Sequence, residues 1–140
     1  MKISKTFKFD MAHMLEEHDG KCRNLHGHSY ELTIFLEGDL VETGPKSGMV
    51  MDYGDVKDIV YNTVLKNLDH SFIYNRNNVL ESKIAVLLMD SERKVYPILG
   101  STTAENITKE IFKLLNVKLK KLSCVVLKET DSSSVEYYGE

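Results

Sequence analysis

The sequence predicts an α+β domain in which helices cover one face of an antiparallel β-sheet. Apolar and polar residues alternate near both ends of the chain, as they do in half-buried strands. Two segments between those ends carry apolar residues at helical spacing. A length of 140 residues suits a single domain, so residues 1–140 are expected to fold as one unit.

The first two strands are expected to flank a polar loop at residues 16–21. Alternation over residues 6–13 places four side chains on one face: Phe7, Phe9, Met11 and His13. A second alternating face begins at two histidines: His26, His28, Tyr30, Leu32, Ile34 and Leu36. These two segments are expected to pair as antiparallel strands.

Two helices are expected in the middle of the chain. Asp52 is a suitable N-cap for the first, whose apolar positions recur at helical spacing: Val56, Ile59, Val60, Val64 and Leu68. The second is indicated by Thr102 and Glu105, which have the spacing of a capping box. Its buried stripe is expected to contain Ile107, Ile111, Leu114 and Leu115.

The segment Val79–Gly100 separates the two helices. It contains an apolar stretch that fits a strand or a short helix, then a charged turn at residues 90–94, then a second apolar stretch. We interpret it as a hairpin-like insertion. After the second helix, residues 119–128 alternate again, and residues 133–138 are expected to pair with them as a closing hairpin.

The composition is that of an ordinary globular protein, with 42% hydrophobic residues and a net charge of −3. It argues against a basic nucleic-acid binder and against a disordered chain. Apolar runs such as residues 84–89 are far shorter than the roughly 20 residues of a membrane span, and the N-terminus does not resemble a secretory signal. A cytoplasmic location is therefore expected. Cys22 and Cys124 form no CxxC motif and are expected to be reduced, with Cys124 in the core.

Three histidines suggest a metal site. His26 and His28 are two residues apart on a strand, so their side chains point the same way from Cα atoms roughly 6.5 Å apart. His13, from the paired strand, is placed to supply a third nitrogen to a zinc ion and to leave one coordination position open for catalysis. An isolated His-x-His pair is more often an ordinary part of a strand. Cys22 either closes this site as a fourth ligand or acts as a thiolate base, and composition does not decide between the two.

Three further residues are candidates for chemistry. Asp69 and His70, at the end of the first helix, could face one cleft in which His70 moves a proton, although neighbours in sequence rarely bond each other. The alternative is a solvated helix terminus. Alternation places Glu129 on the face opposite Lys128. A carboxylate there is suited to accept two parallel hydrogen bonds from one edge of a ligand. The alternative is an ordinary exposed glutamate on a strand.

A series of short motifs runs nearly from end to end: Phe9–His13, Cys22–Tyr30, Gly48–Tyr53, Leu68–His70, Thr103–Asn106, Lys128–Thr130 and Tyr138–Glu140. In this order and spacing, the motifs resemble those of the 6-pyruvoyl-tetrahydropterin synthase and 6-carboxy-tetrahydropterin synthase family. The resemblance implies the tunnelling fold (T-fold), in which the sheets of three chains form a β-barrel and two trimers stack as a hexamer, with sites between subunits.

The resemblance also implies a role for each site residue. Zinc (Zn²⁺) is held by His13, His26 and His28, and Cys22 is the catalytic base. Asp69 and His70 are its proton-transfer partners, reaching it from a neighbouring chain. Glu129 anchors the pterin ring, and Thr103 and Glu105 help to hold it. The implied partners are a reduced pterin triphosphate and further copies of the chain, with no nucleic acid and no membrane.

The product is less tightly specified than the substrate. The three-residue gap between Cys22 and His26 resembles the 6-carboxy-tetrahydropterin synthases of queuosine biosynthesis, which convert 7,8-dihydroneopterin triphosphate to 6-carboxy-tetrahydropterin, acetaldehyde and triphosphate. The alternatives are a 6-pyruvoyl-tetrahydropterin synthase and a non-catalytic zinc-binding member. The Val79–Gly100 insertion is longer than is typical of the carboxy-forming enzymes, and covers the pocket or serves a subunit interface. Lys21, Arg23 or a lysine of another subunit would bind the triphosphate.

Overall fold

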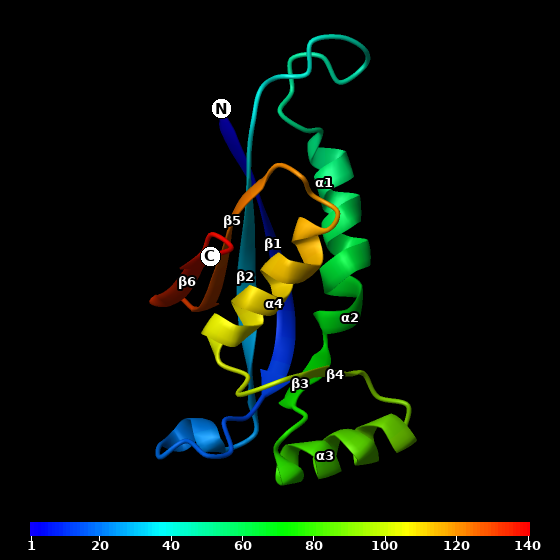
Figure 1. Ribbon diagram of the computed structural model, residues 1–140. Helices are drawn as coiled ribbons and strands as arrows, with labels where there is room; N and C mark the ends of the chain where they lie inside the picture. The colour runs from blue at the N-terminus through cyan, green and yellow to red at the C-terminus, as the bar shows by residue number, and fades with distance from the viewer.

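The chain folds around one mixed six-stranded sheet with strand order β4-β3-β1-β2-β5-β6. The computed structural model describes residues 1–140. The strands are β1 (Lys2–His13), β2 (His26–Glu37), β3 (Ser71–Asn75), β4 (Val95–Ile98), β5 (Leu122–Thr130) and β6 (Ser133–Tyr137). The helices are α1 (Tyr53–Val60), α2 (Lys66–Leu68), α3 (Val79–Asp90) and α4 (Ala104–Asn116), with a 3₁₀ turn at Lys21–Arg23. Figure 1 shows α1 and α4 running alongside the sheet and α3 near one end of it.

The long β1–β2 hairpin confirms the predicted antiparallel pair and extends it to twelve residues per strand. Its register runs from Lys2 opposite Glu37 to His13 opposite His26. Alternate residues on one face are buried beneath the helices, including Phe9, Met11 and Leu32. Because side chains alternate between faces, this register places the histidines on the same inner face as the core.

The first helical segment agrees with the prediction, including its cap. The Asp52 carboxylate accepts a hydrogen bond from the Gly54 amide at 2.7 Å. Helical structure then continues to Leu68 through a π-helical turn at Tyr61–Leu65. Val56 and Leu68 lie in the core, so burial of the apolar stripe, together with the cap, accounts for this segment.

The cap of α4 differs from the prediction by one residue. The N-cap is Thr103, whose hydroxyl accepts from the Asn106 amide at 3.3 Å. Thr102 is buried, and its hydroxyl donates to the carbonyl of Met14 at 3.2 Å. The predicted capping box at Thr102 and Glu105 is therefore wrong, because the Thr102 hydroxyl bonds to the chain just after β1.

The hairpin-like interpretation of Val79–Gly100 is also wrong. Residues 79–90 form the helix α3, and β4 pairs in parallel with β3, with Phe72 opposite Val95. A parallel pair needs a crossover connection, which α3 supplies. Ala85 of α3 packs with Phe72 in a small second core. The sheet is thus mixed rather than wholly antiparallel, and a third substantial helix adds to the two that were expected.

The closing hairpin confirms the prediction, with β5 and β6 antiparallel at one edge of the sheet. The main core lies between the sheet and the helices α1 and α4. Cys124 is buried on β5, as expected. No helix combines the length and the apolar character needed to cross a membrane.

Candidate active site

Three histidine side chains converge at one end of the inner face of the sheet. His13 ends β1 and lies opposite His26, while His28 lies opposite Met11. The ring centroids are 4.6 Å apart for His13 and His26, 5.2 Å for His13 and His28, and 5.0 Å for His26 and His28. One nitrogen of each ring lies within 4.8 Å of the other two. The predicted convergence is confirmed, and this cluster is called the histidine site.

Backbone carbonyls fix the orientation of two of these rings. His13 Nδ1 donates to the Thr102 carbonyl at 2.7 Å, and His26 Nδ1 donates to the Asn24 carbonyl at 2.6 Å. A proton on Nδ1 leaves the Nε2 lone pair free to bind a metal. Burial lowers the pKa of His13 to about 4, so this ring is neutral at pH 7.

The donors of the histidine site fit a zinc ion. The Nε2 atoms of His13 and His28 are buried and have no hydrogen-bond partner in the protein. Buried polar atoms are rarely left without a partner. Three neutral imidazole nitrogens are a common zinc ligand set, and they leave a coordination position for a small molecule. These three residues could therefore hold the ion without further side chains.

Cys22 lies outside this ligand group. It is half-buried on the 3₁₀ turn Lys21–Arg23, where its carbonyl accepts from the Leu15 amide at 2.9 Å. The group of mutually close ligand atoms contains the three histidines alone. The geometry therefore favours an open three-histidine site over a closed one with a sulfur ligand. Cys22 and Cys124 are both free thiols, as predicted.

Glu129 reaches the histidine site from β5. Its Oε1 lies 3.8 Å from His28 Nε2, and its side chain is 25% exposed. A carboxylate at the rim of a partly buried site can accept hydrogen bonds from a bound molecule. Alternation predicts only that Glu129 lies on the face of the strand opposite Lys128, and the structure adds its proximity to His28.

Tyr30 is a residue of this region that the sequence reasoning did not select. Its hydroxyl is buried without a partner, and its ring meets that of His28 edge-on at 5.6 Å. Burial, with a smaller contribution from the charge of Glu129, raises the pKa of Tyr30. The available signal was that Tyr30 continues the alternating face of His26 and His28.

Asp69 and His70 form a bonded pair in a different place. His70 Nδ1 lies 2.8 Å from Asp69 Oδ1, so these neighbours do bond each other, contrary to the general expectation. His70 has a φ of 62°, in the left-handed region. The backbone of Asp10 bonds to both Asp69 and His70. The Asp10 amide donates to Asp69 Oδ1 at 3.1 Å, and the Asp10 carbonyl accepts from the His70 amide at 2.7 Å.

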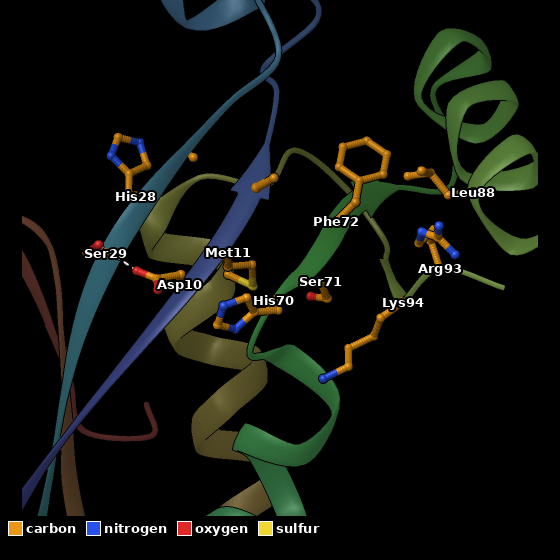
Figure 2. Close-up of a pocket in the computed structure, with 12 residues that line it drawn as sticks. Asp10, Met11, His28, Ser29, His70, Ser71, Phe72, Leu88, Arg93 and Lys94 are labelled. Carbon is orange, nitrogen blue, oxygen red and sulfur yellow. Dashed lines mark hydrogen bonds between the residues drawn. The ribbon is translucent and has the colours of Figure 1, made fainter. Parts of the chain in front are cut away.

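His70 lines a cavity of about 600 Å³, which His28 of the histidine site also lines (Figure 2). The cavity is also lined by Asp10 and Ser29, which alternate with inner-face residues along β1 and β2. The insertion contributes Leu88, Arg93 and Lys94 to the same cavity. Within one chain, Asp69 and His70 are thus not part of the ligand group formed by the three histidines.

The start of α4 borders the histidine site through Thr102, whose carbonyl bonds to His13. Thr103 is half-buried and engaged as the N-cap, and Glu105 is exposed in the first turn. Thr103 and Glu105 therefore lie within three positions of Thr102, whose carbonyl orients His13.

Comparisons with known proteins show which family this chain resembles. The family model for 6-pyruvoyl tetrahydropterin synthase matches residues 2–140. A 6-carboxy-5,6,7,8-tetrahydropterin synthase of Haemophilus influenzae is 47% identical over 137 residues, covering 97% of each chain. The synthase of the same name from Synechocystis is 35% identical, over 98% of this chain and 92% of its own.

Two solved structures share the fold. A protein from Wolinella succinogenes superposes with a TM-score of 0.82 at 22% identity, covering 100% of this chain and 98% of its own. The 6-pyruvoyl tetrahydropterin synthase of Caenorhabditis elegans superposes with a TM-score of 0.72 at 24% identity, covering 100% of this chain and 96% of its own. The expected tunnelling fold is confirmed at the level of the single chain. The chain belongs to the 6-pyruvoyl tetrahydropterin synthase family.

Proposed function

We propose that this chain is a zinc-dependent 6-carboxy-5,6,7,8-tetrahydropterin synthase of queuosine biosynthesis. It would convert 7,8-dihydroneopterin triphosphate to 6-carboxy-tetrahydropterin, acetaldehyde and triphosphate. The observation that carries the proposal is the convergence of three imidazoles beside Glu129, with two Nε2 atoms lacking a protein partner. The similarity to synthases of that name over nearly the whole chain supports it.

The histidine site would bind zinc through His13, His26 and His28. When bound, the ion supplies a Lewis acid that stabilises negative charge developing on a substrate oxygen. The Glu129 carboxylate would accept hydrogen bonds from the ring N–H and from the amino group of the pterin, which lie side by side. Thr103 and Glu105 would support the ring at the start of α4.

Cys22, in its thiolate form, would act as the base that removes a carbon-bound proton from the substrate. The hydrogen-bonded pair Asp69 and His70 would exchange that proton with Cys22. The carboxylate orients the imidazole through the 2.8 Å bond, and the contacts with Asp10 hold the pair in place. Because this pair is not part of the histidine site of its own chain, we assign it to the active site of a neighbouring subunit.

The single sheet has two free edges, β4 and β6, through which copies can associate. We propose that three chains close a β-barrel and that two such trimers stack as a hexamer, with residues 1–140 acting as one synthase domain. Lys21 and Arg23, beside Cys22, remain our candidates for binding the triphosphate.

The experiment that tests this function is a product assay. Purified zinc-loaded protein is incubated with 7,8-dihydroneopterin triphosphate, and acetaldehyde is measured together with the pterin product. We expect acetaldehyde and 6-carboxy-tetrahydropterin in equal amounts. Release of triphosphate without acetaldehyde would instead identify a 6-pyruvoyl-tetrahydropterin synthase, the activity in the description of the matching family model.

A matched variant separates catalysis from metal binding alone. Cys22→Ala removes the proposed base and leaves the three histidines in place, so it should abolish turnover while zinc content stays at the wild-type level. Absence of turnover in the wild type under the same conditions would favour a non-catalytic zinc-binding protein.

A further inference from the structure

The peptide unit between Asp69 and His70 is hydrogen-bonded at both of its polar ends. Its N–H, which belongs to His70, donates to the Asp10 carbonyl at 2.7 Å. Its carbonyl, which belongs to Asp69, accepts from Lys94 Nζ at 2.5 Å. Because a peptide unit is planar, hydrogen bonds at both ends fix the orientation of its plane. That plane sets one backbone dihedral angle on each side of it, ψ of Asp69 and φ of His70.

The angle set in this way at His70 is an unfavourable one. Its φ of 62° lies in the left-handed region, which residues other than glycine adopt infrequently. Such a conformation costs free energy and persists only where surrounding contacts hold it. Because φ sets the direction in which a side chain leaves the backbone, the bonds to this peptide unit also determine where the His70 imidazole lies.

Lys94 reaches this peptide unit from the Val79–Gly100 insertion. Its ammonium also donates to the Lys66 carbonyl at 3.0 Å, in α2, and Figure 2 shows the side chain extending toward the end of that helix. The last carbonyls of a helix lack partners within the helix, and a cation is favoured there. The Lys94 carbonyl accepts from the Phe72 amide at 3.1 Å. One residue of the insertion thus contacts the chain both before and after His70.

The contacts of Lys94 are directed at the backbone. Both hydrogen bonds of its ammonium go to carbonyl oxygens, and such charge-assisted bonds are stronger than those between neutral groups. The neighbouring cation makes no such contact, because Arg93 Nη1 donates to the Ser91 carbonyl at 2.7 Å, within its own turn. Among the cations that the insertion contributes to the cavity, Lys94 is therefore the one bonded to the Asp69–His70 segment.

We propose that Lys94 is a positioning residue: by binding the Asp69 carbonyl, it fixes the backbone angle that places the His70 imidazole. The proposal rests on the proposed function, in which the Asp69–His70 pair exchanges a proton with Cys22. Proton transfer needs hydrogen-bond distance, so moving the ring by about 1 Å lowers the rate of the chemical step. The insertion thus acts on the reaction through the backbone.

The test compares wild type with Lys94→Met, which keeps an unbranched side chain and removes the charge and its donors. Conversion of 7,8-dihydroneopterin triphosphate by the zinc-loaded proteins gives kcat and KM. We expect kcat to fall roughly tenfold or more, with KM and zinc content changed by less than about twofold. Lys94→Arg, which retains a cationic donor, should recover most of the lost kcat. An unchanged kcat in Lys94→Met would overturn the proposal.

Lys121→Met is the matched control. The Lys121 ammonium also donates to two backbone carbonyls, those of Asp39 at 3.2 Å and Val50 at 2.8 Å. Lys121 lies beside Glu37, at the opposite end of β2 from the histidine site. Losing these bonds should lower the melting temperature and leave kcat unchanged. A fall in kcat as large as that of Lys94→Met would show a general effect of lost stability and reject positioning.

Inorganic triphosphate separates positioning from direct contact with the substrate, because Lys94 also lines the cavity. Triphosphate should inhibit turnover equally strongly in wild type and in Lys94→Met. Weaker inhibition and a higher KM, with kcat unchanged, would make Lys94 a phosphate-binding residue instead and would refute the proposal.

Hydrogen exchange separates this proposal from the proposed function, because it needs no turnover. The His70 amide, measured by mass spectrometry at the resolution of single amides, should exchange roughly tenfold faster in Lys94→Met than in wild type. Faster exchange together with a wild type that does not convert the substrate would refute the synthase activity and leave the control of His70 by Lys94 standing. A wild type that turns over, with exchange unchanged in Lys94→Met, would support the synthase and reject the role of Lys94.

Discussion

At the scale of single residues, the Nδ1 atoms of two imidazoles in the histidine site are already hydrogen-bonded to backbone carbonyls. The carbonyls of Thr102 and Asn24 accept from His13 and His26, which directs the other nitrogen of each ring toward the common centre. Because two of the three rings are oriented before any metal binds, these two should lose little conformational entropy on binding.

Removing one imidazole should release the metal. His28→Ala is expected to lower zinc affinity by roughly 100-fold or more, because a ligand nitrogen is lost from a set of three. Zinc per chain, measured by atomic emission after dialysis against a weak chelator, should fall accordingly. His18→Ala is the control: His18 is exposed in the loop, where its Nδ1 accepts from the Gly20 amide. Equal zinc retention in both variants would contradict the assignment.

The sequence predicted the convergence of the histidines because strand periodicity alone places them on one face. The orienting carbonyls of Thr102 and Asn24 depend on loop geometry, which has no periodic signal. Tyr30 was missed for a related reason. An aromatic residue on a buried face is normally a core residue, and only the structure shows that its hydroxyl has no partner.

At the scale of elements, the two helix caps illustrate what local sequence can specify. Asp52 was predicted correctly, since one carboxylate oxygen accepts from the Gly54 amide while the other accepts from Lys46, so the second contact does not compete with the cap. At α4, Thr102 and Thr103 are adjacent, and either is suitable by residue type. The choice is made by a contact distant in sequence, the bond from Thr102 to Met14.

The cap assignment predicts different outcomes for the two threonines. Thr103→Ala should destabilise the protein by about 1 kcal/mol through loss of the N-cap, and Thr103→Ser should restore most of that loss. Urea unfolding of the three proteins measures both effects. A full loss in Thr103→Ser would show that the methyl group, not the cap, stabilises this turn.

The Val79–Gly100 insertion was harder to predict, because its helix α3 carries apolar residues on the exposed face as well as on the buried face. Val79, Leu80 and Leu87 of α3 are exposed, whereas Ala85 is buried. Such a run has no clear amphipathic period, so strand and helix were both acceptable interpretations. The parallel pairing of β4 with β3 joins segments twenty or more residues apart and cannot be read from local pattern.

A buried carboxylate in α3 gives a prediction about pH. Glu81 is 3% exposed, and burial raises its pKa above the usual value, although a hydrogen bond from the Asn75 amide acts in the opposite direction. The folded state therefore holds the Glu81 proton more tightly than the unfolded state, and this group reduces stability as the pH rises above its ordinary pKa.

Glu81→Gln removes that pH-dependent cost while keeping an oxygen to accept from Asn75. The variant should be more stable than wild type at pH 7, and the difference should shrink as the pH falls to 4, where Glu81 is protonated in the folded protein. Thermal unfolding at several pH values measures the difference. A constant difference across this range would contradict a raised pKa as the cause.

At the scale of the whole molecule, the fold separates two groups of candidate residues. The three histidines and Glu129 lie on the inner face of the sheet, while His70, bonded to Asp69, lines a cavity that His28 and outer-facing residues of β1 and β2 also line (Figure 2). Sequence motifs place both groups in one active site, and one chain alone does not join them. Association of several chains would reconcile the two, which makes the oligomer part of the proposed catalytic apparatus.

X-ray absorption at the zinc edge of the purified protein tests the central claim most directly, because it reports the atoms that surround the metal. We predict a first shell of three imidazole nitrogens and one oxygen donor, at about 2.0–2.1 Å. A sulfur contribution at about 2.3 Å would place Cys22 on the metal, and fewer than three imidazoles would show that the ligand set is incomplete. Either result would contradict an open three-histidine site.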